Sequence, residues 1–474
     1  MTSLRHRRRP CTAGLALLLA LGVGRAAVAG ARGERPPSLL LIVSDDQRAD
    51  AIGALGNPQV RTPALDRLAG EGFVFERAYC MGSYSGAVCC PSRAMLLSGR
   101  HLFRFERPNP QPAADLPSLP AVLRDGGWTT FATGKWHNGR AWLQRGFEQG
   151  DAVFLGGMGS HTELSVRDFT SVGEVREGEP YTIAAFSSTT FARAAAEFLR
   201  SVPPEDPFLC YVAFTAPHDP RTPPAEVRAL YDPADLELPP NFLPRHPFDN
   251  GELVIRDEKL APTPRDPDVI REHLADYYAM ITQMDTQVGE LLGTLAECGR
   301  AGDTIVVFTS DQGLAVGSHG LLGKQNLYEH SVRAPLIVRA PGVPRGRSDA
   351  LVYLFDLVPT LCELLDLEAP AGVDGASLVP VLRGEQATVR DSVFLAYKDV
   401  QRAVTDGRWK LIRYPKVDRI QLFDLERDPH EVVDLAADPE QAERVQGLTT
   451  RLRAWQRELG DEAPLEVEQP AGGR

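Results

Sequence analysis

Three nearly continuous apolar runs along the chain each end on polar residues. The runs cover residues 38–44, 208–215 and 304–309. An apolar run of this length without alternation is typical of a strand buried on both faces of a parallel sheet. The residues that follow the runs are Asp45-Asp46, Ala216-Pro217-His218 and Ser310-Asp311-Gln312. Because open α/β sheets bind ligands beyond the carboxyl ends of their strands, we expect these polar residues to meet in one site.

The segments between and after these runs complete the fold class. Helical periodicity is clear in residues 116–124, 191–200 and 269–298, and helices that alternate with strands predict an α/β sheet covered on both faces. Beyond residue 382 short strands are expected at 393–397, 402–405, 409–414 and 421–424, followed by a helix at 439–459. The prediction is a large domain, residues 36–382, with a mainly parallel central sheet flanked by helices, and a small C-terminal antiparallel-sheet subdomain with a helix, residues 383–465.

The first 29 residues have the pattern of a signal peptide. Four arginines between positions 5 and 9 precede an apolar stretch at 13–22 and the small residues Ala27-Val28-Ala29. The alternative is an uncleaved anchor, but the apolar stretch is short for a bilayer span. We therefore expect an exported protein, periplasmic or extracellular, with no membrane span after cleavage.

Composition and net charge exclude some classes of binding partner. The chain has 474 residues, 43% of them hydrophobic and 24% charged, and a formal net charge of −12. Such an acidic surface is a poor match for nucleic acid. It does not exclude an anionic substrate, since the local charges of a pocket can oppose the net charge. The seven cysteines are too few for a dense disulfide framework in so long an exported chain.

The stretch with the most specific chemistry begins at Cys89. Residues 89–100 read CCPSRAMLLSGR, which by itself could be a helix start with a buried cysteine and with Pro91 in the first turn. It also resembles the signature of the formylglycine-dependent (type I) sulfatases of the alkaline phosphatase-like superfamily, C-x-P-S-R followed by leucine and S/T-G-R. The other motifs of that family appear in family order along the chain: Asp45-Asp46, residues 134–139 (GKWHNG), residues 217–219 (PHD) and residues 310–324, which run from SDQG through HG to a lysine.

The resemblance implies an alkaline phosphatase-like fold, a modified nucleophile and a metal. A formylglycine-generating system would oxidise Cys89, and the hydrated aldehyde would be both nucleophile and metal ligand. Asp45, Asp46, Asp311 and the amide oxygen of Gln312 complete an all-oxygen set, which suits Ca²⁺ first and Mg²⁺ second and would hold zinc poorly.

The resemblance also distributes roles among the basic residues. One hydroxyl of the hydrated aldehyde attacks sulfur while Lys135 and Lys324 neutralise the sulfuryl oxygens, and Arg93 favours the alkoxide. His218, with Lys324, protonates the leaving alcohol. His137 takes the proton of the remaining hydroxyl, which expels sulfate and restores the aldehyde.

Two positions depart from the family pattern. Asparagine or histidine more often follows the metal-binding aspartate than the Gln312 found here, so its longer side chain could leave the carbonyl outside the metal shell. The residue after the modified cysteine is Cys90, so a disulfide between adjacent cysteines is a competing fate for Cys89.

Two other functions stay open. One is a phosphonate or phosphate ester hydrolase of the same superfamily. The other is a non-catalytic sulfated-glycan binding protein, in which Cys89 stays a thiol; the complete set of lysines and histidines argues against it.

Substrate identity is inferred from compartment rather than from contacts. Export and long loops favour sulfated carbohydrates as substrates, with small aryl or choline sulfates as alternatives. The candidate substrate contacts are His319, His246, Asp249, Asn250, Lys398 and Arg402.

Overall fold

The computed structural model describes residues 35–107, 111–173 and 175–466. The predicted signal peptide, residues 1–29, lies outside the described residues. The described residues from Pro36 onward form one compact unit.

The largest element of this unit is a mixed sheet of eleven strands. Its order is β12-β2-β11-β10-β1-β9-β4-β5-β6-β7, and β8 pairs with β6. The strands are β1 (Ser38–Ser44), β2 (Phe73–Tyr79), β4 (Thr129–Lys135), β5 (Gln149–Phe154), β6 (Ser165–Thr170), β7 (Arg176–Glu177), β8 (Tyr181–Thr182), β9 (Phe208–Ala213), β10 (Thr304–Ser310), β11 (Arg333–Arg339) and β12 (Gly346–Tyr353). The central run from β10 through β1, β9 and β4 to β5 is parallel throughout, which confirms the predicted parallel core.

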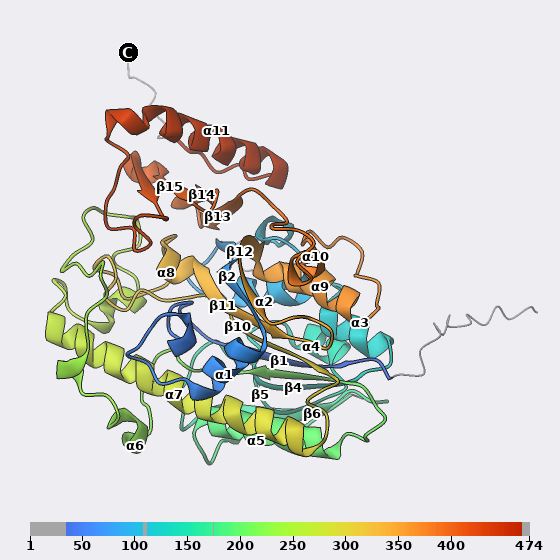
Figure 1. Cartoon of the computed structure of the whole chain (residues 1–474). Helices are drawn as coiled ribbons and strands as arrows, with labels where there is room; N and C mark the ends of the chain where they lie inside the picture. The colour runs from blue at the N-terminus through green and yellow to red at the C-terminus, as the bar shows by residue number, and fades with distance from the viewer. Residues whose placement is uncertain (1–34, 108–110, 174, 467–474) are drawn as a thin grey trace, which may run out of the picture. The chain divides into compact units, whose positions relative to one another are not determined.

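Strand β1 shows how the sheet is covered on both faces. Leu39, Leu41 and Val43 belong to one hydrophobic cluster, and Leu40 and Ile42 belong to another. Successive side chains of a strand point to opposite faces, so an uninterrupted apolar run requires apolar partners on both sides. Figure 1 shows α1, α5 and α7 on one side of the sheet and α2, α9 and α10 on the other.

Eleven α-helices accompany the sheets in the described part of the chain. They are α1 (Pro63–Glu71), α2 (Cys89–Ser98), α3 (Leu119–Asp125), α4 (Arg140–Gly146), α5 (Ser187–Ser201), α6 (Ala225–Arg228), α7 (Pro267–Glu297), α8 (Glu329–Val332), α9 (Leu357–Leu364), α10 (Val379–Leu382) and α11 (Ala442–Leu459). The helices expected from periodicity at 116–124, 191–200, 269–298 and 439–459 correspond to α3, α5, α7 and α11.

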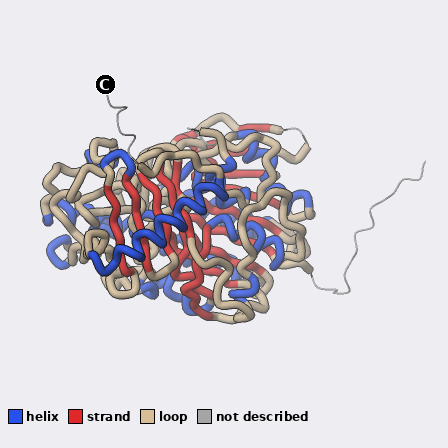
Figure 2. The backbone as a smooth tube through the Cα atoms, turned by 90° about the horizontal axis from the view of Figure 1, so that it is seen from above, coloured by secondary structure: helices blue, strands red, loops and turns tan. Residues whose placement is uncertain are grey.

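A second, five-stranded sheet follows near the C-terminus. Its strands, in the order β16-β15-β14-β13-β3, are β3 (Gly82–Ser83), β13 (Val393–Tyr397), β14 (Gln401–Thr405), β15 (Trp409–Tyr414) and β16 (Arg419–Asp424). Strands β13 to β16 form the predicted antiparallel meander. Helix α11 packs on β14 and β15, and Figure 2 shows it crossing these strands.

The short strand β3 is an addition that the sequence did not predict. It lies a few positions before Cys89 in the sequence, and its two residues pair in parallel with Ala396 and Tyr397 of β13. A two-residue strand leaves no alternation in the sequence, so only the folded chain shows this link. The boundary placed at residue 382 stays a prediction.

Among the described helices, none combines the length and apolar character that a membrane span needs.

Candidate active site

The carboxylates that follow two adjacent strands lie together at the end of the parallel core. Strands β1 and β10 pair so that Ser44 lies opposite Ser310, which places Asp45 and Asp46 beside Asp311. Asp46 has a left-handed backbone (φ 68°), and its N–H donates to Asp311 Oδ1 at 3.1 Å. All three carboxylates are buried. The sequence prediction that these strand ends meet is confirmed.

Two buried oxygens of this group have no hydrogen-bond partner among the described residues. They are Asp45 Oδ1 and Gln312 Oε1. The amide nitrogen of Gln312 donates to Asp46 Oδ1 at 2.5 Å, so its carbonyl oxygen is the free end of the side chain. Unsatisfied buried oxygens are costly, and a hard cation is the partner that carboxylate and amide oxygens would bind. The donor set therefore fits an oxygen-bound divalent cation.

Cys89 is the first residue of α2, and its thiol faces the same group. Its Sγ lies 3.1 Å from His137 Nδ1 and 3.4 Å from Lys135 Nζ. Ligand atoms of Asp45, Cys89 and Asp311 lie within 4.8 Å of one another. A hydroxyl on the side chain at position 89 could therefore reach both the cation site and a histidine.

The neighbouring Cys90 faces elsewhere. Its Sγ contacts Asn138 Oδ1 at 3.6 Å and Gln111 Nε2 at 3.3 Å. The six cysteines in the described part of the chain are all thiols, so the competing disulfide between Cys89 and Cys90 is not formed.

Three buried cations balance the carboxylates. Arg93 donates from Nε to Asp311 Oδ2 at 2.9 Å, Lys135 Nζ donates to Asp45 Oδ2 at 2.5 Å, and Lys324 Nζ donates to both oxygens of Asp46 at 2.7 and 2.8 Å. Burial and the nearby charge of Asp45 nevertheless raise the pKa of Asp311 to about 6.

Two histidines face this charged group from different sides. Burial and the charge of Lys135 lower the pKa of His137 to about 2, so at neutral pH its imidazole is a base. Burial and Lys324 lower the pKa of His218 to about 4. His218 Nδ1 donates to the carbonyl of Asp219 at 2.7 Å, which leaves its Nε2, 3.7 Å from Asp46 Oδ2, to face the site.

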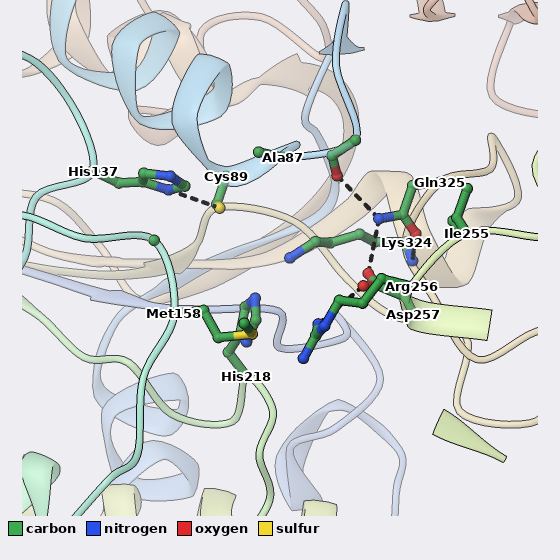
Figure 3. Close-up of a pocket in the computed structure, with 12 residues that line it drawn as sticks. Ala87, Cys89, His137, Met158, His218, Ile255, Arg256, Asp257, Lys324 and Gln325 are labelled. Carbon is green, nitrogen blue, oxygen red and sulfur yellow. Dashed lines mark hydrogen bonds and ion pairs between the residues drawn. The ribbon is translucent and has the colours of Figure 1, made fainter. Parts of the chain in front are cut away.

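The site opens into a cavity of about 320 Å³. Figure 3 shows Cys89 and His137 at one end of it and His218, Lys324 and Arg256 around the remainder. The lining residues are Gly86, Ala87, Cys89, His137, Gly157, Met158, His218, Ile255, Arg256, Asp257, Lys324 and Gln325.

Comparison with known proteins decides the family. The sulfatase family model matches residues 37–367, which is more than half of the chain. The chain belongs to the sulfatase family. It is a sulfuric ester hydrolase of the alkaline phosphatase-like superfamily. A second family model, for the C-terminal part of N-sulphoglucosamine sulphohydrolase, matches residues 317–458.

This sulfatase is similar in sequence to named relatives and similar in fold to solved structures. It is 30% identical over 439 residues to an N-acetylgalactosamine-6-sulfatase of Canis lupus familiaris, covering 84% of this chain and 75% of that protein. A structure solved in complex with its substrate D-glucosamine-2-N,6-O-disulfate matches at a TM-score of 0.75 and 23% identity, over 92% of this chain and all of that one. The phosphonate monoester hydrolase of Agrobacterium radiobacter matches at a TM-score of 0.72 and 23% identity with the same coverage. Both structures share the fold.

Four predicted substrate contacts of the sulfatase have other partners and do not line the cavity. His319 stacks on Tyr328, and its Nε2 donates to the carbonyl of Glu431. His246 contacts the carbonyl of Phe248 and the hydroxyl of Tyr328. Lys398 pairs with Glu252, and buried Arg402 pairs with Asp461. The two further candidates, Asp249 and Asn250, accept hydrogen bonds from backbone N–H groups of their own loop.

One positioning residue, His161, could not be identified from the sequence. His161 is buried, and its Nε2 donates to the carbonyl of His218 at 2.9 Å, while Ser187 and Thr215 contact its Nδ1. It therefore fixes the backbone that carries His218. An isolated histidine in an irregular segment gives no sequence signal for such a role.

Proposed function

We propose that this sulfatase is an exported enzyme, periplasmic or extracellular, that hydrolyses sulfate esters of carbohydrates with a formylglycine made from Cys89. Each turnover consumes one water and releases an alcohol and inorganic sulfate. One observation carries the proposal: the side chain at position 89 meets His137, Lys135 and the carboxylates of Asp45 and Asp311 at a single point at the end of the cavity.

The basic residues have distinct tasks in this proposal. Lys135 and Lys324 lie on the two sides where charge on the sulfuryl oxygens must be neutralised. Both lysines keep their protons at neutral pH, although burial by itself would lower their pKa. Asp45 and Cys89 raise the pKa of Lys135, and Asp46 and Cys89 raise the pKa of Lys324 well above the usual value.

Lys324 is therefore the group that carries a proton for the leaving alcohol. His218 has a pKa lowered to about 4, so its Nε2 can pass a proton to the alcohol only after taking one up. Neutral His137 is the base that contacts position 89.

A divalent cation, Ca²⁺ or Mg²⁺, is the proposed cofactor. Asp45, Asp46, Asp311, Gln312 and the modified side chain at position 89 would hold it, and when bound it supplies Lewis-acid stabilisation of negative charge on oxygen. The unsatisfied oxygens of Asp45 and Gln312 support this assignment.

Gln312 offers a direct test of the cation site. Gln312→Asn keeps an amide oxygen and should retain cation affinity, whereas Gln312→Leu should weaken it, as measured by calorimetric titration with Ca²⁺ and Mg²⁺. If both variants bind the cation like the parent, Gln312 is outside the shell.

The names of similar proteins support a sulfated amino sugar as substrate. One relative acts on N-acetylgalactosamine 6-sulfate by its name, and a structural neighbour was solved with a glucosamine disulfate. The phosphonate monoester hydrolase of the same fold supports the alternative, a phosphonate ester hydrolase.

A hydrolysis screen separates these functions. Protein matured with a formylglycine-generating system is first checked for the aldehyde by mass spectrometry. It is then offered N-acetylglucosamine 6-sulfate, N-acetylgalactosamine 6-sulfate, an aryl sulfate, choline sulfate and an aryl phosphonate monoester. We expect sulfate release from a sugar sulfate at the highest kcat/KM. Faster cleavage of the phosphonate would favour the alternative hydrolase, and tight binding without any cleavage would favour the binding protein.

A further inference from the structure

The mouth of the active-site cavity has an apolar side and a cationic side. Met158 lines the cavity with half of its surface exposed, and Ile255 lines it beside Arg256. Apolar side chains at the opening suit the face of a sugar ring that presents C–H groups, while the cation suits an anionic substituent on the ring. Figure 3 shows Met158, His218 and Arg256 on the same side of the pocket, away from Cys89.

Arg256 is held in place by two carboxylates. Its Nη1 donates to Asp219 Oδ1 at 3.1 Å and to Asp257 Oδ1 at 3.0 Å, and its Nη2 donates to Asp219 Oδ2. These bonds use three of the five N–H groups of a guanidinium. Because 47% of the side chain is exposed, the remaining two groups are available to a ligand.

The two carboxylates connect Arg256 to both ends of the active site. Asp219 follows His218 in the sequence. Asp257 Oδ2 accepts a hydrogen bond from Gln325 Nε2 at 2.8 Å, and the same nitrogen donates to the carbonyl of Gly86 at 3.0 Å, just before α2. The guanidinium is therefore fixed relative to His218 and to the nucleophile, so a ligand would lose little binding energy in ordering it.

Arg256 pairs with two carboxylates, so it would hold an anion through its two remaining N–H groups and not through an excess of positive charge. Among the charged lining residues, Lys324 and Arg256 are cations and Asp257 is a carboxylate. Both oxygens of Asp257 are already engaged. Lys324 pairs with Asp46 in the sulfuryl part of the site, which leaves Arg256 as the cation that faces the rest of the substrate.

We propose that Arg256 binds a second anionic group of the substrate, so that the preferred substrate is a sulfated sugar with another oxyanion, either a second sulfate or a carboxylate, near the scissile ester. This inference rests on the proposed function and names its substrate class. Arg256 is a binding residue here and takes no part in bond cleavage.

The test compares substrates that differ in this second group. The pair N-acetylglucosamine 6-sulfate and glucosamine-2-N,6-O-disulfate isolates a second sulfate, and a 6-sulfated disaccharide with and without a uronic carboxylate isolates a carboxylate. We expect the parent enzyme to prefer one dianionic member. In Arg256→Ala the kcat/KM ratio of that member to its monoanionic partner should fall about tenfold or more, because charged hydrogen bonds are lost. Arg256→Lys should retain part of the preference.

The matched control is Arg408→Ala. Arg408 is 46% exposed and is also paired with two carboxylates, Asp424 and Glu426, and it does not line the cavity. Its removal should leave the substrate ratio unchanged. Added salt should reduce the preference of the parent enzyme and have little effect on Arg256→Ala.

The outcomes separate this inference from the proposed function. Loss of activity on all substrates by the same factor in Arg256→Ala would mean that Arg256 acts through Asp219 and His218, and the inference would be wrong. A parent enzyme that cleaves sugar sulfates without preferring either dianionic member would also overturn it, while the proposed function would stand. An aldehyde-bearing parent that cleaves no sulfate ester would overturn both.

Discussion

Adjacent cysteines in this protein have different surroundings, although nothing in their own chemistry distinguishes them. Cys89 Sγ contacts His137 and Lys135 in the active-site cavity, whereas Cys90 Sγ faces Asn138 and Gln111. We therefore expect peptide mass spectrometry of matured protein to find the aldehyde at position 89 and a thiol at position 90. Cys90→Ser should keep most of the sulfate release and Cys89→Ala should lose essentially all of it.

The variants also distinguish a chemical role from a structural one. Cys89→Ala should fold with an unchanged circular dichroism spectrum and still bind the cation, though more weakly. An aldehyde at position 90, or sulfate release by Cys89→Ala, would contradict the proposed mechanism.

The two histidines should fail in different ways when replaced. Loss of a proton donor hurts most when the leaving group is poor, so His218→Ala should reduce kcat/KM on sugar sulfates at least tenfold more than on activated aryl sulfates. His137→Ala should let covalently sulfated protein accumulate, detectable by intact-protein mass spectrometry. Equal losses by His218→Ala on both substrate types would assign the proton donor to Lys324 instead.

At the residue scale, motifs predicted which charged side chains meet but not how they are supported. The strand-end aspartates could be placed from sequence because parallel strands deliver their carboxyl ends to one edge. The contacts of His161 and Arg256 could not, because they depend on loops that approach one another only in the folded chain. The same holds for Arg93, which is one turn beyond Cys89 but directs its Nε to Asp311.

At the scale of elements, strands buried on both faces were predictable and others were not. Strands β1, β9 and β10 are continuous apolar runs, and all were expected. Strand β4 contains four threonine or glycine residues among seven (TTFATGK), so its sequence is not recognisably that of a core strand, although it ends on Lys135.

Strand β4 also contains a glycine that packing requires. Gly134 has φ 85°, and a Cβ there would lie 1.9 Å from the carbonyl oxygen of Ala213 in β9. Gly134→Ala should therefore lower the free energy of unfolding by about 2–4 kcal/mol and reduce sulfate release, since Lys135 follows directly. Chemical denaturation with a sulfate-release assay on the same samples measures both.

Gly127→Ala is the control for backbone strain alone. Gly127 has φ 96°, and among the described residues no atom lies within 4 Å of the position that a Cβ would take. The substitution should therefore cost only about 1–2 kcal/mol, with activity retained. Equal destabilisation by the two variants would mean that the close approach of β4 and β9 contributes nothing.

At the scale of the whole molecule, the two sheets share one hydrophobic cluster. It includes Leu41 of β1 and Leu411 of β15, and β3 pairs with β13 immediately upstream of the nucleophile helix. The two sheets could be predicted separately, but not these joints, because they are contacts between segments hundreds of residues apart. The small sheet therefore packs against the large one and pairs with the segment that precedes the nucleophile helix.

A buried charge cluster lies at this joint and makes its stability sensitive to pH. Lys410 of β15 is fully buried and pairs with Glu329 at 2.8 Å and Glu431 at 2.9 Å. Burial raises the pKa of Glu431 from its ordinary 4.5 to about 7, despite the opposing charge of Lys410. A raised carboxyl pKa means that folding favours the protonated form, so this group costs stability as the pH rises from about 4.5 through 7.

Lys410→Met should turn this cost into a large one at alkaline pH. Without the ammonium group, two buried carboxylates face each other, so at pH 8 the free energy of unfolding should fall by about 3–5 kcal/mol. At pH 5 the loss should be smaller, because Glu431 keeps its proton in the folded state. Lys398→Met removes a partly exposed pair with Glu252 and should cost about 1 kcal/mol or less at both pH values. Denaturant unfolding at pH 5 and pH 8 measures the difference, and a Lys410→Met loss that does not grow with pH would show that Glu431 does not gain its charge in this cluster between the two pH values.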